Sequence, residues 1–210
     1  MIIDHNHPEY KRLSGNVHYN GAYYYSIEIV KNIIPEIDTD RNWMTLNIPY
    51  VGLDHSIVFI HNNLEFGQYE WLERLSDLVL VCSQPKTCQA MEKYGQVIYL
   101  PLSVDLEEVK SYSHITKDKG TAYVGRREKI KNITLPKDID YICEESRSEM
   151  LNKMSHYLNI YAVGRCAIEG KILDCQILPF DPRYPNPKIW KILDNKDAAK
   201  ILNNKLKGLK

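Results

Sequence analysis

The sequence predicts an α/β protein of two small lobes, each built on a parallel sheet, with a helix closing the C-terminus. Short runs rich in Val, Ile and Leu alternate along the chain with segments of helical pattern, and such alternation is typical of doubly wound parallel sheets. The alternation pauses in a polar stretch after Val104 and then starts again. One pause between two alternating halves indicates two lobes joined by a linker.

The first lobe is expected over residues 1–105. Its predicted strands are short apolar runs bounded by polar or turn-forming residues, and they cover residues 1–4, 43–48, 56–60, 78–82 and 97–100. Helices are predicted between them at 21–34, 68–75 and 85–94. Pro35 ends the first of these because proline lacks the amide that a helix needs, and Gly95 is a typical stop for the third.

A polar linker is expected at 106–119 and the second lobe at 120–210. The strands of this lobe are predicted in the phrases TAYVG, DIDYIC, NIYAVG and CQILPF. Helices are predicted at 145–156 and 165–173, and the closing helix at 196–206.

Composition narrows the class of protein. The 210 residues are 44% hydrophobic and 26% charged, which is ordinary for a soluble globular chain with a sizeable core. The 27 basic and 27 acidic side chains balance, so the chain as a whole does not attract phosphate backbones or anionic lipids. We therefore do not expect nonspecific nucleic-acid binding.

The cysteines and the apolar segments predict the compartment. Five cysteines without a CxxC pair are typical of reduced thiols that pack as small hydrophobic side chains. The N-terminus lacks a signal-peptide pattern, and no apolar run is long enough to span a bilayer. We expect a cytoplasmic protein without a membrane span.

Open parallel sheets bind ligands beyond the carboxyl ends of their strands, so residues at those ends are candidates for a site. His61 follows the run IVFI; an imidazole at this place could act as a general base, or it could equally be a structural histidine. It has no HxH or HxxxH partner, so no metal site is expected. Asn20 and Gly21 open the first predicted helix, where backbone amides could face an anion or Asn20 could simply be an N-cap.

Two strand ends in the second lobe carry charged residues. In YVGRREKIKN, Gly125 allows close approach to the backbone, while Arg126 and Lys131 offer the charges that neutralise a diphosphate. The same run of cations could also be a solvated turn. In YAVGRCAIEG, Arg165 and Glu169 are four residues apart at the start of a helix. They could form an exposed ion pair, or Glu169 could accept the hydroxyls of a ribose.

Taken in order, these motifs resemble the glycosyltransferases of the GT-B fold, a family of two-lobed nucleotide-sugar transferases. The resemblance covers most of the chain and rests on IVFIHNN, LVLVCSQPKTCQAMEKYG, LPLSVD, TAYVGRREKIKN and VGRCAIEGKILDCQIL. It implies two Rossmann-like lobes, with the acceptor side in the first and the nucleotide-sugar side in the second. It also implies that Gly125, Arg126 and Lys131 grip the donor diphosphate, and that Glu169 binds the ribose.

The chain departs from the family pattern at several positions. Many retaining members carry a second glutamate about eight residues before the ribose-binding one, where this chain has Tyr161. Asp174 replaces a glycine of the family, and Asn132 replaces the glycine that usually follows the lysine. These departures weaken the expectation of catalysis more than that of the fold, because a scaffold tolerates changed site residues.

The leading hypothesis is a glycosyltransferase that moves a sugar from a nucleotide-sugar to an unidentified acceptor, with no metal or other cofactor. Arg126 and Lys131 would act catalytically on the leaving diphosphate, and His61 would take the acceptor proton or orient the sugar. Donor-binding residues would be Asn20, Gly21, Gly125, Arg126, Lys131, Arg165 and Glu169. One alternative is a catalytically degenerate relative that binds a nucleotide or a protein partner. The other is a transferase that modifies nucleic acid through the basic stripe 126–131 and the C-terminal lysines.

Overall fold

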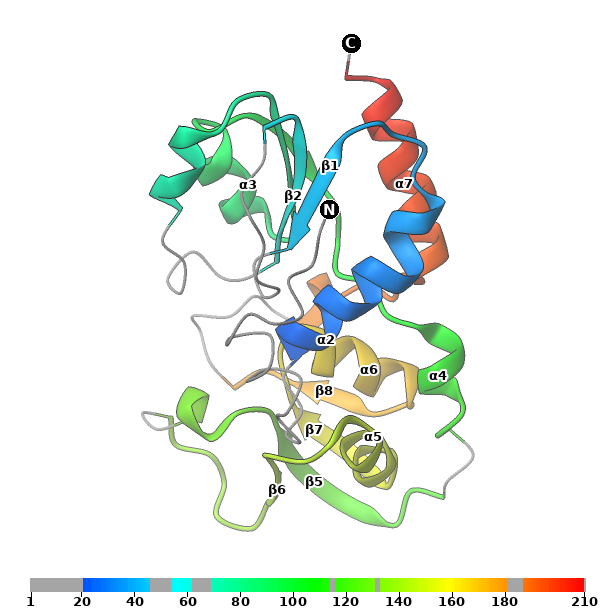
Figure 1. Cartoon of the computed structure of the whole chain (residues 1–210). Coiled ribbons are helices and arrows are strands. Elements are labelled where there is room, and N and C mark those ends of the chain that lie inside the picture. Colours follow the sequence, from blue (N-terminus) through cyan, green and yellow to red (C-terminus); the bar gives the residue numbers. More distant parts are fainter. Residues whose placement is uncertain are drawn as a thin grey trace. The chain divides into compact units, whose positions relative to one another are not determined.

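The predicted fold class is confirmed by a computed structural model of the chain: an α/β protein with two parallel four-stranded sheets and a C-terminal helix (Figure 1). The structure describes residues 21–45, 54–61, 69–113, 116–130, 133–180 and 187–209. The strand predicted at 1–4 and the candidate residues Asn20 and Lys131 lie outside these ranges. The described residues form two compact units, with a division after Leu102 and a return to the first unit at Asn195.

The first sheet has the order β1-β2-β3-β4, and all its strands are parallel. The strands are β1 (Asn42–Thr45), β2 (Ser56–Ile60), β3 (Leu78–Cys82) and β4 (Gln96–Tyr99). All five residues of β2 and of β3 are buried, as expected for the central strands of a sheet covered on both faces. The sequence pattern predicted these two strands to the residue.

The helices of the first unit are more irregular than the sequence predicts. The segment predicted as one helix at 21–34 divides into α2 (Gly21–Glu28), a π-helical turn η1 (Ile29–Ile33) and a 3-10 turn η2 (Ile34–Glu36) that contains Pro35. The helix predicted at 68–75 is a 3-10 helix, η4 (Glu70–Arg74). The third is α3 (Pro85–Met91), which begins with its proline as predicted.

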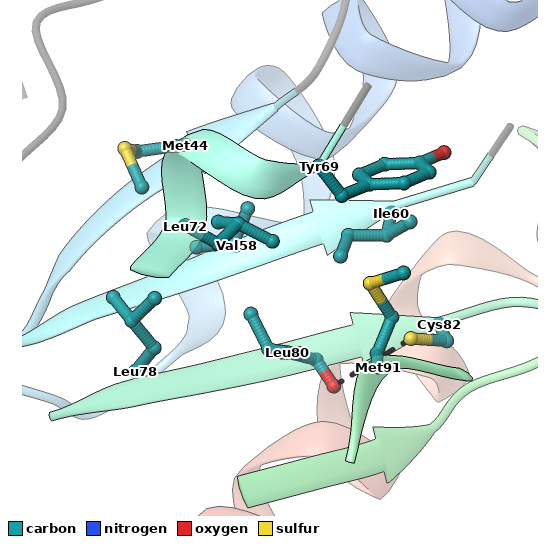
Figure 2. Close-up of a cluster of buried hydrophobic side chains, with 9 residues drawn as sticks. All are labelled: Met44, Val58, Ile60, Tyr69, Leu72, Leu78, Leu80, Cys82 and Met91. Carbon is teal, nitrogen blue, oxygen red and sulfur yellow. Dashed lines mark hydrogen bonds between the residues drawn. The ribbon is translucent and has the colours of Figure 1, made fainter. Parts of the chain in front are cut away.

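One face of the first sheet packs against η4 and α3 (Figure 2). Alternate residues of the strands point to this face, and the cluster comprises Met44, Val58, Ile60, Tyr69, Leu72, Leu78, Leu80, Cys82 and Met91. The intervening residues point to the opposite face, where His61 contacts α2. The first sheet is therefore a buried layer between two sets of helices.

The C-terminal helix α7 (Asn195–Lys207) belongs to the first unit, whereas the sequence analysis grouped it with the second lobe. Its buried side contacts η1 and η2, and its polar side chains bond to the same unit. Asn195 donates to the carboxylate of Glu28 at 2.8 Å, and the Asn203 oxygen accepts from the amide of Asp38 at 2.9 Å. The C-terminal helix thus packs on the first unit.

The second sheet has the order β6-β5-β7-β8 and is also fully parallel. Its strands are β5 (Lys119–Val124), β6 (Asp140–Ile142), β7 (Tyr157–Tyr161) and β8 (Gln176–Leu178). The chain moves from β5 to β6 on one side and then crosses to β7 on the other side of β5. This reversal makes the carboxyl ends of β5 and β7 a topological switch point.

Helices α5 (Arg147–Ser155) and α6 (Arg165–Ile172) connect these strands and lie beside one another against β7 (Figure 1). A complete capping box between Ser146 and Glu149 begins α5. Helix α6 packs so closely on the sheet that a Cβ atom at Gly170 would meet the side chains of Ile160 and Ile177. Two short 3-10 turns complete the unit, η5 (Arg127–Ile130) and η6 (Pro187–Ile189).

The predicted linker at 106–119 contains a helix, α4 (Leu106–Lys110), and β5 already begins at Lys119. Asp105 is the N-cap, and its side chain accepts from the amide of Glu108 at 3.0 Å. Val109 is fully buried. The cap and the buried Val109 help to hold this turn on the unit, although its composition is that of a linker. None of the helices in the described part of the chain is long and apolar enough to cross a membrane.

Candidate functional site

The second sheet presents the same Val-Gly-Arg phrase at the ends of two neighbouring strands. Gly125 and Arg126 follow β5, and Gly164 and Arg165 follow β7. These strands are paired, with Tyr123 opposite Tyr161. The two Gly-Arg pairs therefore flank the switch point, where open α/β sheets bind their ligands. The repetition of this phrase in the sequence is a signal that the two strand ends are related.

Both glycines hold backbone conformations that other residues rarely adopt. Gly125 has φ +153°, and a Cβ atom there would lie 2.7 Å from the Tyr123 hydroxyl. That hydroxyl donates to the carbonyl of Arg126 at 2.9 Å. Gly164 is the N-cap of α6 with φ 61°. Each arginine is thus placed by a turn that needs glycine.

The two arginines differ in their surroundings. Arg126 is exposed, as is its neighbour Arg127, whose Nε lies 3.9 Å from the carboxylate of Glu144. Arg165 is the first residue of α6 and only 5% of it is exposed. The site therefore combines a solvent-exposed arginine with a buried one.

The candidate residue Gly21 is the first residue of helix α2, as predicted.

Glu169 is a buried charge. The sequence left open whether it forms an exposed pair with Arg165, and the structure shows the pair at 3.2 Å with the glutamate 0% exposed. The same oxygen, Oε1, also accepts from Nη1 of Arg147 at 2.6 Å. The ion pair between Arg165 and Glu169 therefore exists, but it is buried and not exposed to solvent as the first interpretation supposed. Two guanidinium groups stabilise a carboxylate that has left water.

Arg147 and Glu108 are members of this network that sequence reasoning missed. Arg147 begins α5 and is 5% exposed. Its Nε lies 3.0 Å from both carboxylate oxygens of Glu108, and its Nη2 lies 2.8 Å from Oε2. Glu108 comes from α4, which the sequence analysis had taken as linker. The acidic phrase LEEV carried no signal that distinguishes one glutamate from the next.

At the carboxyl end of β2 in the first unit, His61 is 9% exposed. Its Nε2 lies 3.4 Å from the hydroxyl of Ser26, and Tyr25 packs against its ring edge-on at 5.2 Å. Two neighbouring strands end in buried hydroxyls, those of Thr45 and Ser83, which have no hydrogen-bond partner among the described residues. His61 thus lies among neutral polar groups at a strand end, which is compatible with either role that the sequence left open.

Two of the five cysteines, Cys82 and Cys175, are buried. Burial raises the pKa of the Cys82 and Cys175 thiols above its ordinary value, so both favour the unreactive protonated form. Within the described ranges, no group of His, Cys, Asp and Glu side chains is arranged to hold a metal ion.

Comparison with known proteins does not show a family for this chain. No protein-family model matches the chain, and no curated protein or solved structure matches it either.

Proposed function

We propose that the protein is a glycosyltransferase that uses a nucleotide-sugar donor, as the resemblance to the GT-B family implies. The observation that supports this most is the pair of Gly-Arg turns at the switch point of the second sheet. Arginine forks match phosphate oxygens, and glycine turns let a ligand approach the backbone. The second unit would bind the donor.

In the proposed reaction an acceptor oxygen attacks the anomeric carbon, and the bond from that carbon to the diphosphate oxygen breaks. The leaving nucleoside diphosphate carries the growing negative charge. Arg126, Arg165 and Lys131 would stabilise it, and such electrostatic stabilisation is usually the largest contribution to catalysis. His61 remains our prediction for the group that accepts the acceptor proton if the transfer inverts configuration.

Glu169 has a clearer role in holding Arg165 than in touching the ribose. Its Oε1 accepts from two arginines, and none of the residue is exposed. Direct contact with a ribose, which the family resemblance implies, remains a prediction. In either role, loss of the carboxylate would disturb Arg165 and hence the donor site.

Thermal unfolding with nucleoside diphosphates and their sugars tests the proposal. A specific ligand at a hundred times its dissociation constant adds about 2.7 kcal/mol to stability, a shift of roughly 5–10 °C for a chain of this size. Arg126→Ala should abolish most of this shift. Arg127→Ala is the matched control, because it removes an adjacent exposed arginine from the same turn. Equal shifts in the two variants would contradict the assignment of Arg126.

A second candidate function is a relative that binds a nucleotide without turnover. Two observations favour it: Tyr161 occupies the position of the second family glutamate, and the Glu169 carboxylate is already bound by two guanidinium groups. Turnover separates the candidates. An enzyme releases nucleoside diphosphate when donor and acceptors are supplied, whereas a binding protein shows the thermal shift and releases none.

A further inference from the structure

We infer that Arg147 is a positioning residue for the donor site, acting through Glu169 on Arg165. The inference rests on the proposed function, because it assigns Arg147 to the same site. Arg147 itself is not expected to touch the donor. Its effect would be to fix the place of an arginine that does.

The guanidinium of Arg147 is fixed on two sides. Its Nε and Nη2 face the carboxylate of Glu108, with distances of 2.8 to 3.0 Å. Its Nη1 donates to Oε1 of Glu169 at 2.6 Å. A planar fork can make both contacts at once, whereas a lysine ammonium is a single point of charge on a flexible stem.

The charges of these four residues balance. Arg147, Glu169 and Arg165 together carry one net positive charge, and Glu108 brings the sum of the four to zero. The three inner residues are each at most 5% exposed, and charges out of water are tolerated when they are paired and hydrogen-bonded. Glu108, with 40% of its side chain exposed, closes the network toward solvent.

The contacts connect Arg147 to Arg165 through Glu169. Arg165 lies at the first turn of α6, beside the proposed diphosphate, and it bonds to Glu169 Oε1. Glu169 is held in turn by Arg147, which α4 fixes through Glu108. The short helix that resembles a linker in sequence would therefore help to set the donor site.

The test combines nucleotide binding with a measurement on Arg165 itself. The full-length protein and its variants are titrated by calorimetry with ADP, GDP, UDP, CDP and dTDP, at a temperature where circular dichroism shows each variant folded. Nitrogen-edited NMR then follows the side-chain Nε–H signal of Arg165, which Arg165→Lys identifies. This signal reports the position of the guanidinium without any ligand.

Arg147→Lys keeps the charge and removes the fork. We expect it to shift the Arg165 signal and to weaken binding of the preferred nucleotide about tenfold or more. Glu108→Gln should act in the same direction but less, and it guards against misfolding because Glu108 is partly exposed. Lys153→Met is the control, since it removes an exposed ion pair with Glu145 from the same helix α5, and it should leave both measurements unchanged.

Each outcome has one meaning. If the wild type binds a nucleotide and Arg147→Lys binds it equally well, or leaves the Arg165 signal in place, Arg147 is not a positioning residue and the proposed function stands. If the wild type binds none of the five nucleotides, the proposed function fails and the inference fails with it. Loss of binding with a shifted Arg165 signal supports both.

Discussion

Nδ1 of His55 lies 2.5 Å from the carboxylate of Asp77, and both residues hold a left-handed backbone conformation. The two side chains join the turns that precede β2 and β3. Arg41, which precedes β1, donates to the same Asp77 carboxylate at 3.0 Å, and Asp40 lies 3.4 Å from the other nitrogen of the His55 ring. The amino ends of three neighbouring strands are thus tied together by one exposed ionic cluster.

This cluster predicts a pH dependence of stability. The hydrogen bonds to Asp77 and then to Asp40 raise the pKa of His55 above its ordinary 6.5, against the smaller opposing effects of desolvation and of Arg41. His55 therefore adds stability that is fully present below pH 6.5 and is lost as the pH rises through its folded pKa. Hydrogen bonds from His55 and then from Arg41 lower the pKa of Asp77 below its ordinary 3.8. The stability that Asp77 contributes is therefore present above pH 3.8 and is lost as the pH falls through the folded pKa of Asp77.

The measurement compares melting temperatures of the wild type and His55→Asn, chosen because asparagine tolerates a positive φ. The difference between them should be larger at about pH 5.5 than at about pH 9, and it should shrink with added salt. Asp77→Asn should weaken the pH dependence of the melting temperature, since the asparagine amide carries no charge. A difference that is the same at both pH values would mean that the cluster does not contribute through protonation.

Gly125→Ala is expected to destabilise the second unit by about 1–3 kcal/mol, because alanine at a positive φ is strained. The added Cβ would also press on the Tyr123 hydroxyl, which bonds to the Arg126 carbonyl. Gly120→Ala, within β5, is the control: nothing lies within 4 Å of its Cβ position. It should be neutral or slightly stabilising. Chemical denaturation measures both, and equal losses would contradict the special role of Gly125.

Regular elements of the fold were predictable because their patterns are local. The buried runs of β2 and β3 follow directly from apolar composition, and the helix at Arg165–Ile172 begins directly after Gly164. The division of the segment around Ile29–Ile33 into different helix types was not predictable, because it depends on tertiary contacts rather than on local pattern. The same holds for the return of α7 to the first unit.

The site was predictable only in part, for a related reason. Arg126 and Arg165 stand out because each follows a glycine at a strand end. Arg147 and Glu108 lie 39 positions apart, and a single sequence carries no sign that two such distant charges meet. The burial of Glu169 was likewise hidden, because a spacing of four residues is the same for an exposed pair and a buried one.

The packing of α4 gives a direct test of whether 106–119 behaves as a linker. Val109 is fully buried, so Val109→Ala should cost about 1–3 kcal/mol of unfolding free energy. Lys110→Ala, which removes the adjacent exposed side chain of the same helix, should change stability little. Denaturant titration compares the two. If Val109→Ala were as neutral as its control, α4 would be a linker in solution.

Because α6 lies so close to the second sheet, replacing its glycine by alanine should destabilise the protein, the opposite of the usual effect in a helix. Alanine normally stabilises a helix by about 1 kcal/mol relative to glycine. At Gly170 the new methyl would meet the Cδ1 atoms of Ile160 and Ile177, so Gly170→Ala should instead destabilise by about 1–3 kcal/mol.

Ile160→Val removes one of those methyl groups and by itself should cost about 0.5–1.5 kcal/mol. In the double variant the two changes compensate, so its loss should be smaller than the sum of the single losses, by about 0.5 kcal/mol or more. A double-mutant cycle from denaturation curves measures this coupling. Strict additivity would mean that α6 shifts away from β7 rather than pressing on it, and that the position of Arg165 at its first turn is less rigid than the contacts imply.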